Sequence, residues 1–68
     1  MHRHAALFTM NEAAAYLALS RSTLQRLVRD KRLVAIRIGA AVRFAPKDLD
    51  EFIALKSEAA RRDAGWFE

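Results

Sequence analysis

The chain has 68 residues, a net charge of +4 and no cysteine. This length allows one small domain, and the lack of Cys excludes disulfides and thiolate metal sites and favours a reducing compartment. No segment approaches the roughly 20 apolar residues of a membrane span, and residues 1–7 lack an apolar run of signal-peptide length, so we expect a cytoplasmic protein.

The positive charge is concentrated in one part of the chain. Residues 1–47 carry nine Lys and Arg against two Asp and Glu, a net +7, whereas residues 48–68 carry a net −3. Residues 21–43 alone hold seven basic side chains and one acid, Asp30. Such a basic half joined to an acidic half is typical of a protein that binds a polyanion. A merely soluble surface is the alternative.

Residues 1–7 carry no periodic pattern, and we expect them to form a flexible arm. His2 and His4 make an H-x-H pair, a spacing that could hold a metal ion. Two solvated histidines at a loose terminus are a far commoner arrangement. We therefore predict no metal site and no cofactor.

The first helix is predicted from its capping residues. Thr9 is a good N-cap, and Glu12 three residues later completes a capping box, which predicts a helix from Met10 to Leu17. Ala13 and Ala14 lie on its apolar face. Because both side chains are small, a second helix could approach this face closely.

A second helix follows after a short break. Ser20 is another N-cap, so this helix should begin at Arg21 and end near Asp30. Two short helices joined by a three- to four-residue turn fit a helix-turn-helix, although spacing alone leaves an ordinary helical hairpin open. One side of the second helix is apolar, with Leu24, Leu27 and Val28. The other side is polar and basic, with Arg21, Ser22, Gln25, Arg26 and Arg29.

The polar side of this helix suits the major groove of DNA. Arg can fork onto guanine and Gln can pair bidentately with adenine. We expect groove contacts from Arg21, Ser22, Gln25 and Arg26, and a phosphate contact from Arg29. Ser20 is a candidate contact with a second role as the cap. No aromatic residue lies within residues 20–43, which favours duplex DNA over single-stranded RNA.

A β-hairpin is predicted next. Apolar residues alternate with Arg37 and Arg43 on either side of a Gly39–Ala41 connector. The predicted apolar side holds Ile36, Ile38, Val42 and Phe44, and the polar side holds the two arginines. The small tip, with Gly39, Ala40 and Ala41, could lie against the DNA backbone or enter a minor groove. Before the hairpin, Lys31 and Arg32 are expected to contact phosphate.

The last helix should begin at Pro46 and turn Leu49, Phe52 and Ile53 toward the core, with Gly65 as a stop. The fold class is then α+β, mostly α, with a domain over 8–63 and a tail over 64–68. Trp66 and Phe67 in the tail could mediate self-association or fold back on the core.

An enzymatic function is not expected. Tyr16 near arginines is reminiscent of a tyrosine recombinase nucleophile, but the chain is far too short for that fold. No paired carboxylates, Ser/His/Asp set or Gly-rich phosphate loop is present. We interpret Tyr16 as a surface or seam residue, and we predict no catalytic residue and no small-molecule substrate.

The ordered motifs from residue 8 to residue 53 resemble a known family. The strings T-x-x-E-A-A-x-Y-L, S-R-S-T-L-x-R-L, R-L-x-A-I-R-I-G, V-R-F and D-L-D-E-F occur in this order. Together they resemble the MerR-like winged helix-turn-helix of phage and plasmid excisionases, also called recombination directionality factors. The sequence departs from that pattern at Ala18 and Lys31, where the family often has Gly.

The resemblance implies an accessory DNA-binding factor in a bacterial host cell. Such a factor binds beside a prophage attachment site, bends the DNA and helps integrase, commonly with other copies of itself on adjacent sites. Carried over by position, the recognition helix is 21–30 and the wing is 37–43. Two alternatives stay open, a small phage or plasmid transcription regulator on the same fold and a protein-interaction adaptor with a basic face.

Overall fold

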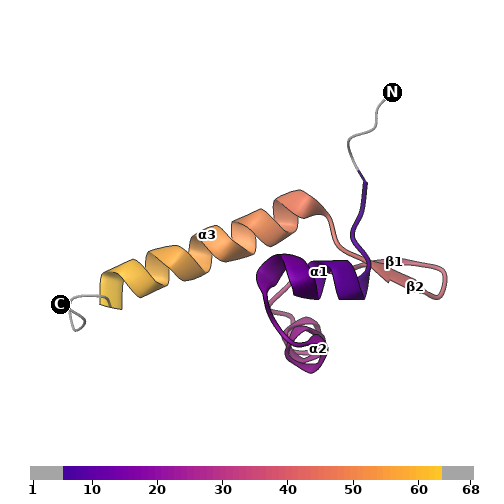
Figure 1. The fold of residues 1–68 in the computed structure, drawn as a ribbon, viewed down its shortest axis with the longest axis horizontal. Helices are drawn as coiled ribbons and strands as arrows, with labels where there is room; N and C mark the ends of the chain where they lie inside the picture. The colour runs from indigo at the N-terminus through magenta and orange to yellow at the C-terminus, as the bar shows by residue number, and fades with distance from the viewer. Residues whose placement is uncertain (1–5, 64–68) are drawn as a thin grey trace.

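Two short helices, a two-stranded hairpin and a long helix follow one another in the computed structural model, which describes residues 6–63 (Figure 1). The elements are α1 (Met10–Leu17), α2 (Arg21–Arg29), β1 (Ile36–Ile38), β2 (Ala41–Arg43) and α3 (Pro46–Asp63). This order confirms the predicted α+β class with a helix-turn-helix. Predictions about His2, His4, Gly65, Trp66 and Phe67 lie outside the described residues.

Both helices of the helix-turn-helix begin at the predicted caps. The backbone N–H of Glu12 donates to the Thr9 hydroxyl at 3.1 Å, and the Thr9 N–H donates to the Glu12 carboxylate at 2.9 Å. At α2 the backbone N–H of Thr23 donates to the Ser20 hydroxyl at 3.1 Å. These side chains satisfy donors that lack partners within a helix, which fixes where each helix starts.

Both short helices end in the same left-handed turn. Ala18 has φ 57° and Lys31 has φ 61°, and the following N–H groups bond back to carbonyls five residues earlier, from Leu19 and from Arg32. This is the Schellman pattern, which usually places Gly at the left-handed position. The absence of Gly at Ala18 and Lys31 therefore leaves the turn geometry intact and adds backbone strain.

Replacing Ala18 with Gly should stabilise the domain. A left-handed non-Gly residue costs about 1–2 kcal/mol, part of which Gly loses again through its larger unfolded-state entropy. We expect a net gain of up to about 1 kcal/mol, or a Tm increase of roughly 4–8 °C. The exposed helical residue Ala15 is the matched control, because Ala15→Gly should cost about 1 kcal/mol. A destabilised Ala18→Gly protein in thermal melts would contradict the strain at this turn.

The hairpin differs from its predicted pattern by one residue. Ala41 belongs to β2 and pairs with Ile38, so the turn holds two residues, Gly39 and Ala40, rather than three. Ile36 consequently pairs with Arg43, and Val42 pairs with Arg37. Opposed residues on an antiparallel pair share a face, and a one-residue shift exchanges the faces.

The prediction of one apolar side and one arginine side is therefore wrong. Arg37 shares a face with Val42, whereas Arg43 shares the other with Ile36. The physical reason is the turn, because two-residue connections with a left-handed residue match the twist of the strands. Gly39 supplies that conformation with φ 61°.

The core lies where α1, α2, the hairpin and the start of α3 meet. Its fully buried large side chains are Leu24, Phe44 and Leu49, joined by Ala13, Ala14 and Leu33. As predicted, the small alanines let α2 pack closely on α1. An isolated antiparallel bridge joins Phe8 to Phe44 and holds the segment that precedes α1 against the end of the hairpin.

The long helix α3 leaves this core part of the way along its length (Figure 1). Leu49 is fully buried and Phe52 packs against the core, as expected, but Ile53 is 40% exposed. The prediction that Ile53 faces the core is wrong because α3 begins to leave the core at this point. The core still covers Phe52, but little protein covers the side of α3 that carries Ile53. None of the helices within 6–63 is both long and apolar enough to cross a membrane.

A polar and aromatic contact joins α1 to α3. The Tyr16 hydroxyl donates a hydrogen bond to the Asp50 carboxylate, and the Tyr16 ring meets the Phe8 ring edge to face with centroids 5.2 Å apart. Tyr16 therefore lies at a seam between helices, in agreement with its sequence interpretation.

This contact predicts an unusual titration of Tyr16. The hydrogen bond to Asp50, with smaller contributions from desolvation and the carboxylate charge, raises the pKa of Tyr16 above 10.0. Because the folded-state pKa is the higher one, the stabilisation is complete below pH 10 and is lost as the pH rises through the folded-state pKa.

Phenolate absorbance checks this prediction directly, since the chain has one Tyr. We expect a titration midpoint above 10.0 in the native protein. The Asp50→Ala variant should return the midpoint toward 10.0, whereas Glu51→Ala, a neighbouring exposed carboxylate, should leave it raised. Equal midpoints in the native and Asp50→Ala proteins would contradict the assigned partner.

Candidate nucleic-acid interface

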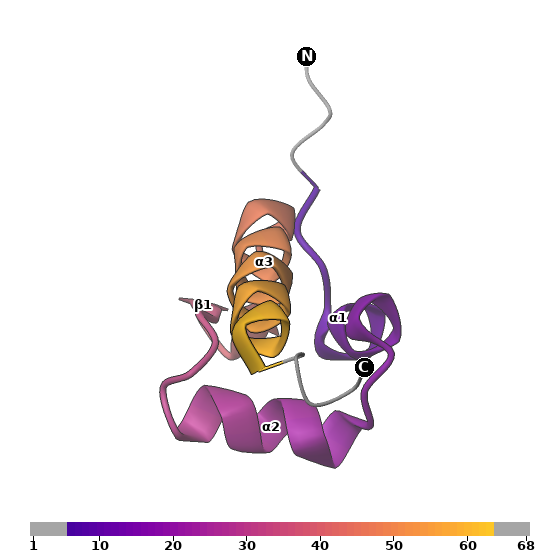
Figure 2. The ribbon, with the colours of Figure 1, turned by 90° about the vertical axis from the view of Figure 1, so that its left-hand side faces the viewer.

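One side of α2 is open to solvent and carries the predicted contact residues. α2 crosses beneath α1, which covers the opposite side of the helix (Figure 2). Leu24 is buried on that covered side, and Leu27 and Val28 pack partly against the core. The exposed side holds Arg21, Ser22, Gln25, Arg26 and Arg29.

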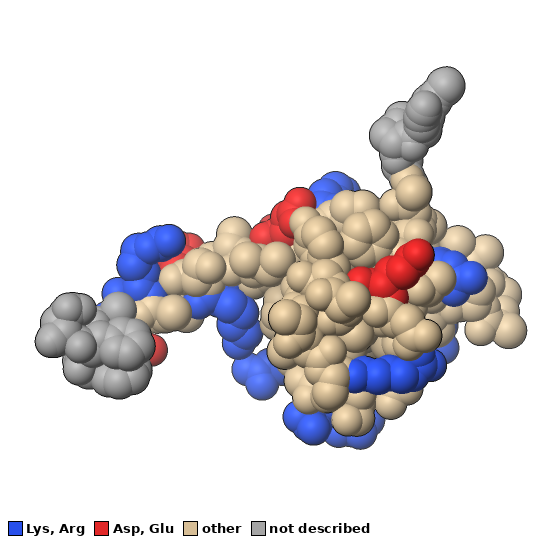
Figure 3. All heavy atoms as spheres, in the orientation of Figure 1, with Lys and Arg blue, Asp and Glu red and all other residues tan. Residues whose placement is uncertain are grey.

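Basic side chains gather over α2, and acidic side chains lie mainly elsewhere. Lys and Arg line the lower edge of the body, while acidic groups lie over α1 and α3 (Figure 3). Within residues 6–63 the one ion pair joins Arg29 to Asp30, at 3.5 Å between side chains that are 72% and 48% exposed. A pair this exposed contributes little, so the positive charge on α2 is left largely uncompensated.

Three adjoining hollows run between α2 and the hairpin. The first is bordered by Arg21 and the 40–43 segment, and it shares its floor residues Met10 and Val42 with the second. The second, bordered by Gln25, Arg29 and Arg37, shares Val28 and Arg37 with the third. We call this continuous depression the basic groove. Its cationic lining residues are Arg21, Arg29, Lys31, Arg32, Arg37 and Arg43.

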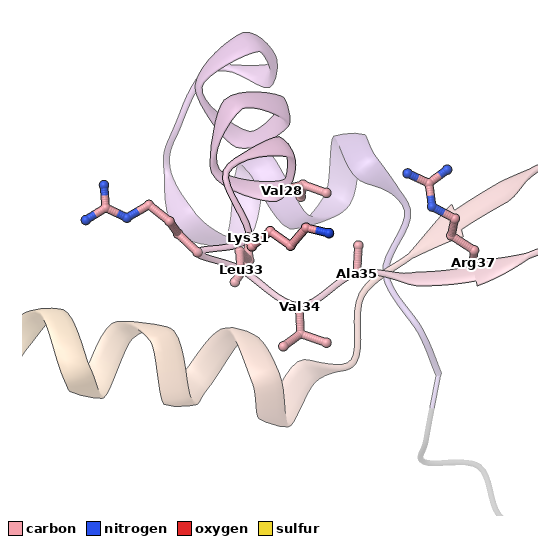
Figure 4. A pocket seen from close by; sticks show the side chains of 7 residues that line it. Val28, Lys31, Leu33, Val34, Ala35 and Arg37 are labelled. Atoms are coloured by element: carbon pink, nitrogen blue, oxygen red, sulfur yellow. The ribbon is translucent and has the colours of Figure 1, made fainter.

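The lining of the basic groove is strongly one-sided in charge. Among the described residues that border the three hollows, none is Asp or Glu, and none is aromatic. Around the third hollow, Lys31 extends toward Ala35, and the guanidinium of Arg37 turns toward the helices, whereas Val34 points toward α3 (Figure 4). The basic side of α2 and the hairpin therefore face a common groove.

The structure sorts the residues predicted from the sequence into two groups. Most of the predicted contacts border the basic groove: Arg21, Gln25, Arg29, Lys31, Arg32, Arg37, Ala40, Ala41 and Arg43. The remaining four do not border it: Ser20, Ser22, Arg26 and Gly39. Ser22 and Arg26 are exposed on α2, Gly39 is exposed in the turn, and the Ser20 hydroxyl is engaged as the cap.

Besides Arg29, which pairs with Asp30, two groove arginines have hydrogen-bond partners within the protein. Arg21 donates to the side-chain oxygen of Asn11, and Arg43 donates to the Val42 carbonyl at 2.8 Å. Asn11 and Met10, in the first turn of α1, border the groove but were not predicted as site residues. No local pattern identifies them, because they reach the groove through the packing of α1 on α2.

An exposed, basic second helix in a helix-turn-helix, with a hairpin beside it, defines a helix-turn-helix domain built to bind a polyanion. The chain belongs to the helix-turn-helix domain family, whose profile matches residues 7–56. Comparison with curated proteins gave no match, and neither did comparison with solved structures. Membership of this family indicates binding to double-stranded DNA.

Proposed function

We propose that the protein is an excisionase, a sequence-specific DNA-binding and DNA-bending factor that directs integrase-mediated recombination toward prophage excision. The observation that carries this proposal is the basic groove, in which α2 and the hairpin present arginines to one ligand without an opposing acid. The family includes excisionase-like DNA-binding proteins, and the motifs between residues 8 and 53 resemble them.

In this proposal α2 enters the major groove as the recognition helix and the hairpin acts as a wing. Ser22 and Arg26, exposed on the outward side of α2, meet base edges. The hairpin contacts the neighbouring backbone or minor groove. A rigid domain with two such contact points can pull the DNA toward its basic surface, which bends it.

We propose that several copies together offset the free-energy cost of bending the DNA. Smooth bending of a 20–30 bp site by 40–90° costs on the order of 1–6 kcal/mol. One 68-residue domain has few contacts to offset that cost, so we propose that copies bind adjacent sites head to tail and form an open array. The protein performs no catalytic step itself, and integrase supplies the strand exchange in the bacterial cytoplasm.

A recombination assay tests the proposal. The cognate integrase, the attachment-site DNA and the protein are combined, and the ratio of excision to integration is measured. We expect the protein to raise this ratio. An unchanged ratio together with site-specific DNA binding would reject the excisionase role and support a transcription regulator.

A salt titration tests the DNA binding that underlies the proposal. With about four phosphate contacts, log K for a mixed-sequence duplex should fall against log salt with a slope near −3.6. Undetectable duplex binding at low salt would reject DNA binding altogether. The basic face would then have to serve an acidic protein partner.

A further inference from the structure

We infer that the basic groove holds the phosphodiester backbone of a single strand of the duplex, and that Lys31 and Arg37 grip this strand from opposite walls. The inference rests on the proposed DNA binding. It goes further by dividing the arginines between backbone and base contacts and by assigning Lys31 a defined position.

The chemistry of the lining selects a backbone rather than bases. The floor residues Met10, Val28 and Val42 are apolar and half-buried, so they offer no hydrogen bonds to base edges. Bases in single strands are commonly held by stacking on aromatic rings, and the groove has none along its described lining. Cations on both walls above an apolar floor match the charge of a phosphodiester chain with its sugars turned inward.

The wall formed by α2 has a regular repeat along the groove. Arg21, Gln25 and Arg29 are four residues apart, so they lie one above another on the side of α2 that faces the hairpin. Ser22 and Arg26 lie outside this row and do not border the groove. We therefore assign Arg21 and Gln25, which were expected from the sequence to read bases, to the backbone instead. Ser22 and Arg26 remain the residues that read bases.

The opposite positions of Lys31 and Arg37 make them the two ends of a clamp. Both border the third hollow, Lys31 from the end of α2 and Arg37 from β1 (Figure 4). The left-handed turn at Lys31 directs the chain out of α2 at this point. The single ion pair within residues 6–63 involves neither cation, so both can take a phosphate without breaking a salt bridge.

Salt dependence of binding gives the first test. We expect Lys31→Gln and Arg37→Gln each to make the slope of log K against log salt shallower by about 0.9 on a mixed-sequence duplex. Arg61→Gln, an exposed arginine in the last turn of α3, is the control and should leave the slope unchanged. Slopes for both groove variants that equal the control slope would overturn the inference.

Neutral linkages give the second test and address the single strand directly. The binding site is first located by footprinting on attachment-region DNA. Methylphosphonates, which replace a charged phosphate with a neutral group, are then placed one at a time on each strand of a short duplex containing that footprinted site. A neutral linkage at a phosphate that Arg37 contacts should weaken binding of the native protein but not of Arg37→Gln, which lacks that contact already. The same comparison with Lys31→Gln identifies the phosphates that Lys31 contacts.

The inference requires both sets of linkages to lie on the same strand, close together. Two sets on opposite strands would overturn it even if duplex binding and excision were established. Conversely, if the native protein binds no duplex, the proposed function itself fails. Circular dichroism of each variant verifies that its fold is retained.

Discussion

Phe44→Ala is expected to remove most of the stability of the domain. Phe44 is fully buried, at the junction between the hairpin and α3, and it lies beside Leu24 and Leu49 in the core cluster. Truncation of a buried Phe to Ala typically costs 3–5 kcal/mol because a cavity remains. A chain of this length has a total free energy of unfolding of about 3–10 kcal/mol, so a large part of the population should unfold.

Urea denaturation followed by circular dichroism checks this expectation. Leu55→Ala is the matched control, since this side chain is 60% exposed on α3 and its loss should change stability by less than about 0.5 kcal/mol. The hydrogen bonds between Phe8 and Phe44 join backbone groups, which Ala also has. The measured loss of stability therefore reports the packing of the Phe44 side chain. A decrease of less than about 1 kcal/mol in the free energy of unfolding of Phe44→Ala would mean that Phe44 is not central to the core.

The parts of the fold that the sequence predicted well depend on local interactions. Both N-caps, the bounds of α1 and the buried side of α2 follow from contacts between residues a few positions apart, such as Thr9 with Glu12. Ala18 and Lys31 show the limit of this reasoning. Each takes a conformation that Gly favours, because the hydrogen bonds of the turn outweigh the local preference.

The hairpin could not be predicted to the residue. An alternation of apolar and basic residues fits a two-residue or a three-residue turn equally well, and the two choices place Arg37 and Arg43 on opposite faces or on one face. The structure has the two-residue turn, with Ala41 opposite Ile38. Ile53 was misplaced for a different reason, since its periodicity is correct but α3 extends beyond the core.

The charge of the candidate site was predictable, but its shape was not. The density of arginines between residues 21 and 43 indicated a polyanion-binding face from composition alone. The groove itself depends on α1, whose Met10 forms part of the floor and whose Asn11 holds Arg21. Contacts of this kind arise only when α1, α2 and the hairpin pack together.

Arg26→Ala is expected to weaken binding to the proper site more than binding to mixed-sequence DNA. Arg26 is exposed on the outward side of α2, away from the basic groove, where it can reach base edges once the helix is in the major groove. Loss of one bidentate contact to guanine is worth about 1–3 kcal/mol, or roughly a 5- to 150-fold loss of discrimination between the two DNAs. Competition gel shifts with the footprinted site and a scrambled duplex measure this ratio.

Arg32→Ala is the control that separates base reading from a general loss of positive charge. Arg32 borders the basic groove beyond the end of α2, and as a phosphate contact it should weaken both DNAs alike and reduce the salt slope by about 0.9. Since both substitutions remove one positive charge from an exposed arginine, a general electrostatic effect would make their results the same. Equal losses for both variants on both DNAs would mean that α2 binds DNA by charge without reading its sequence.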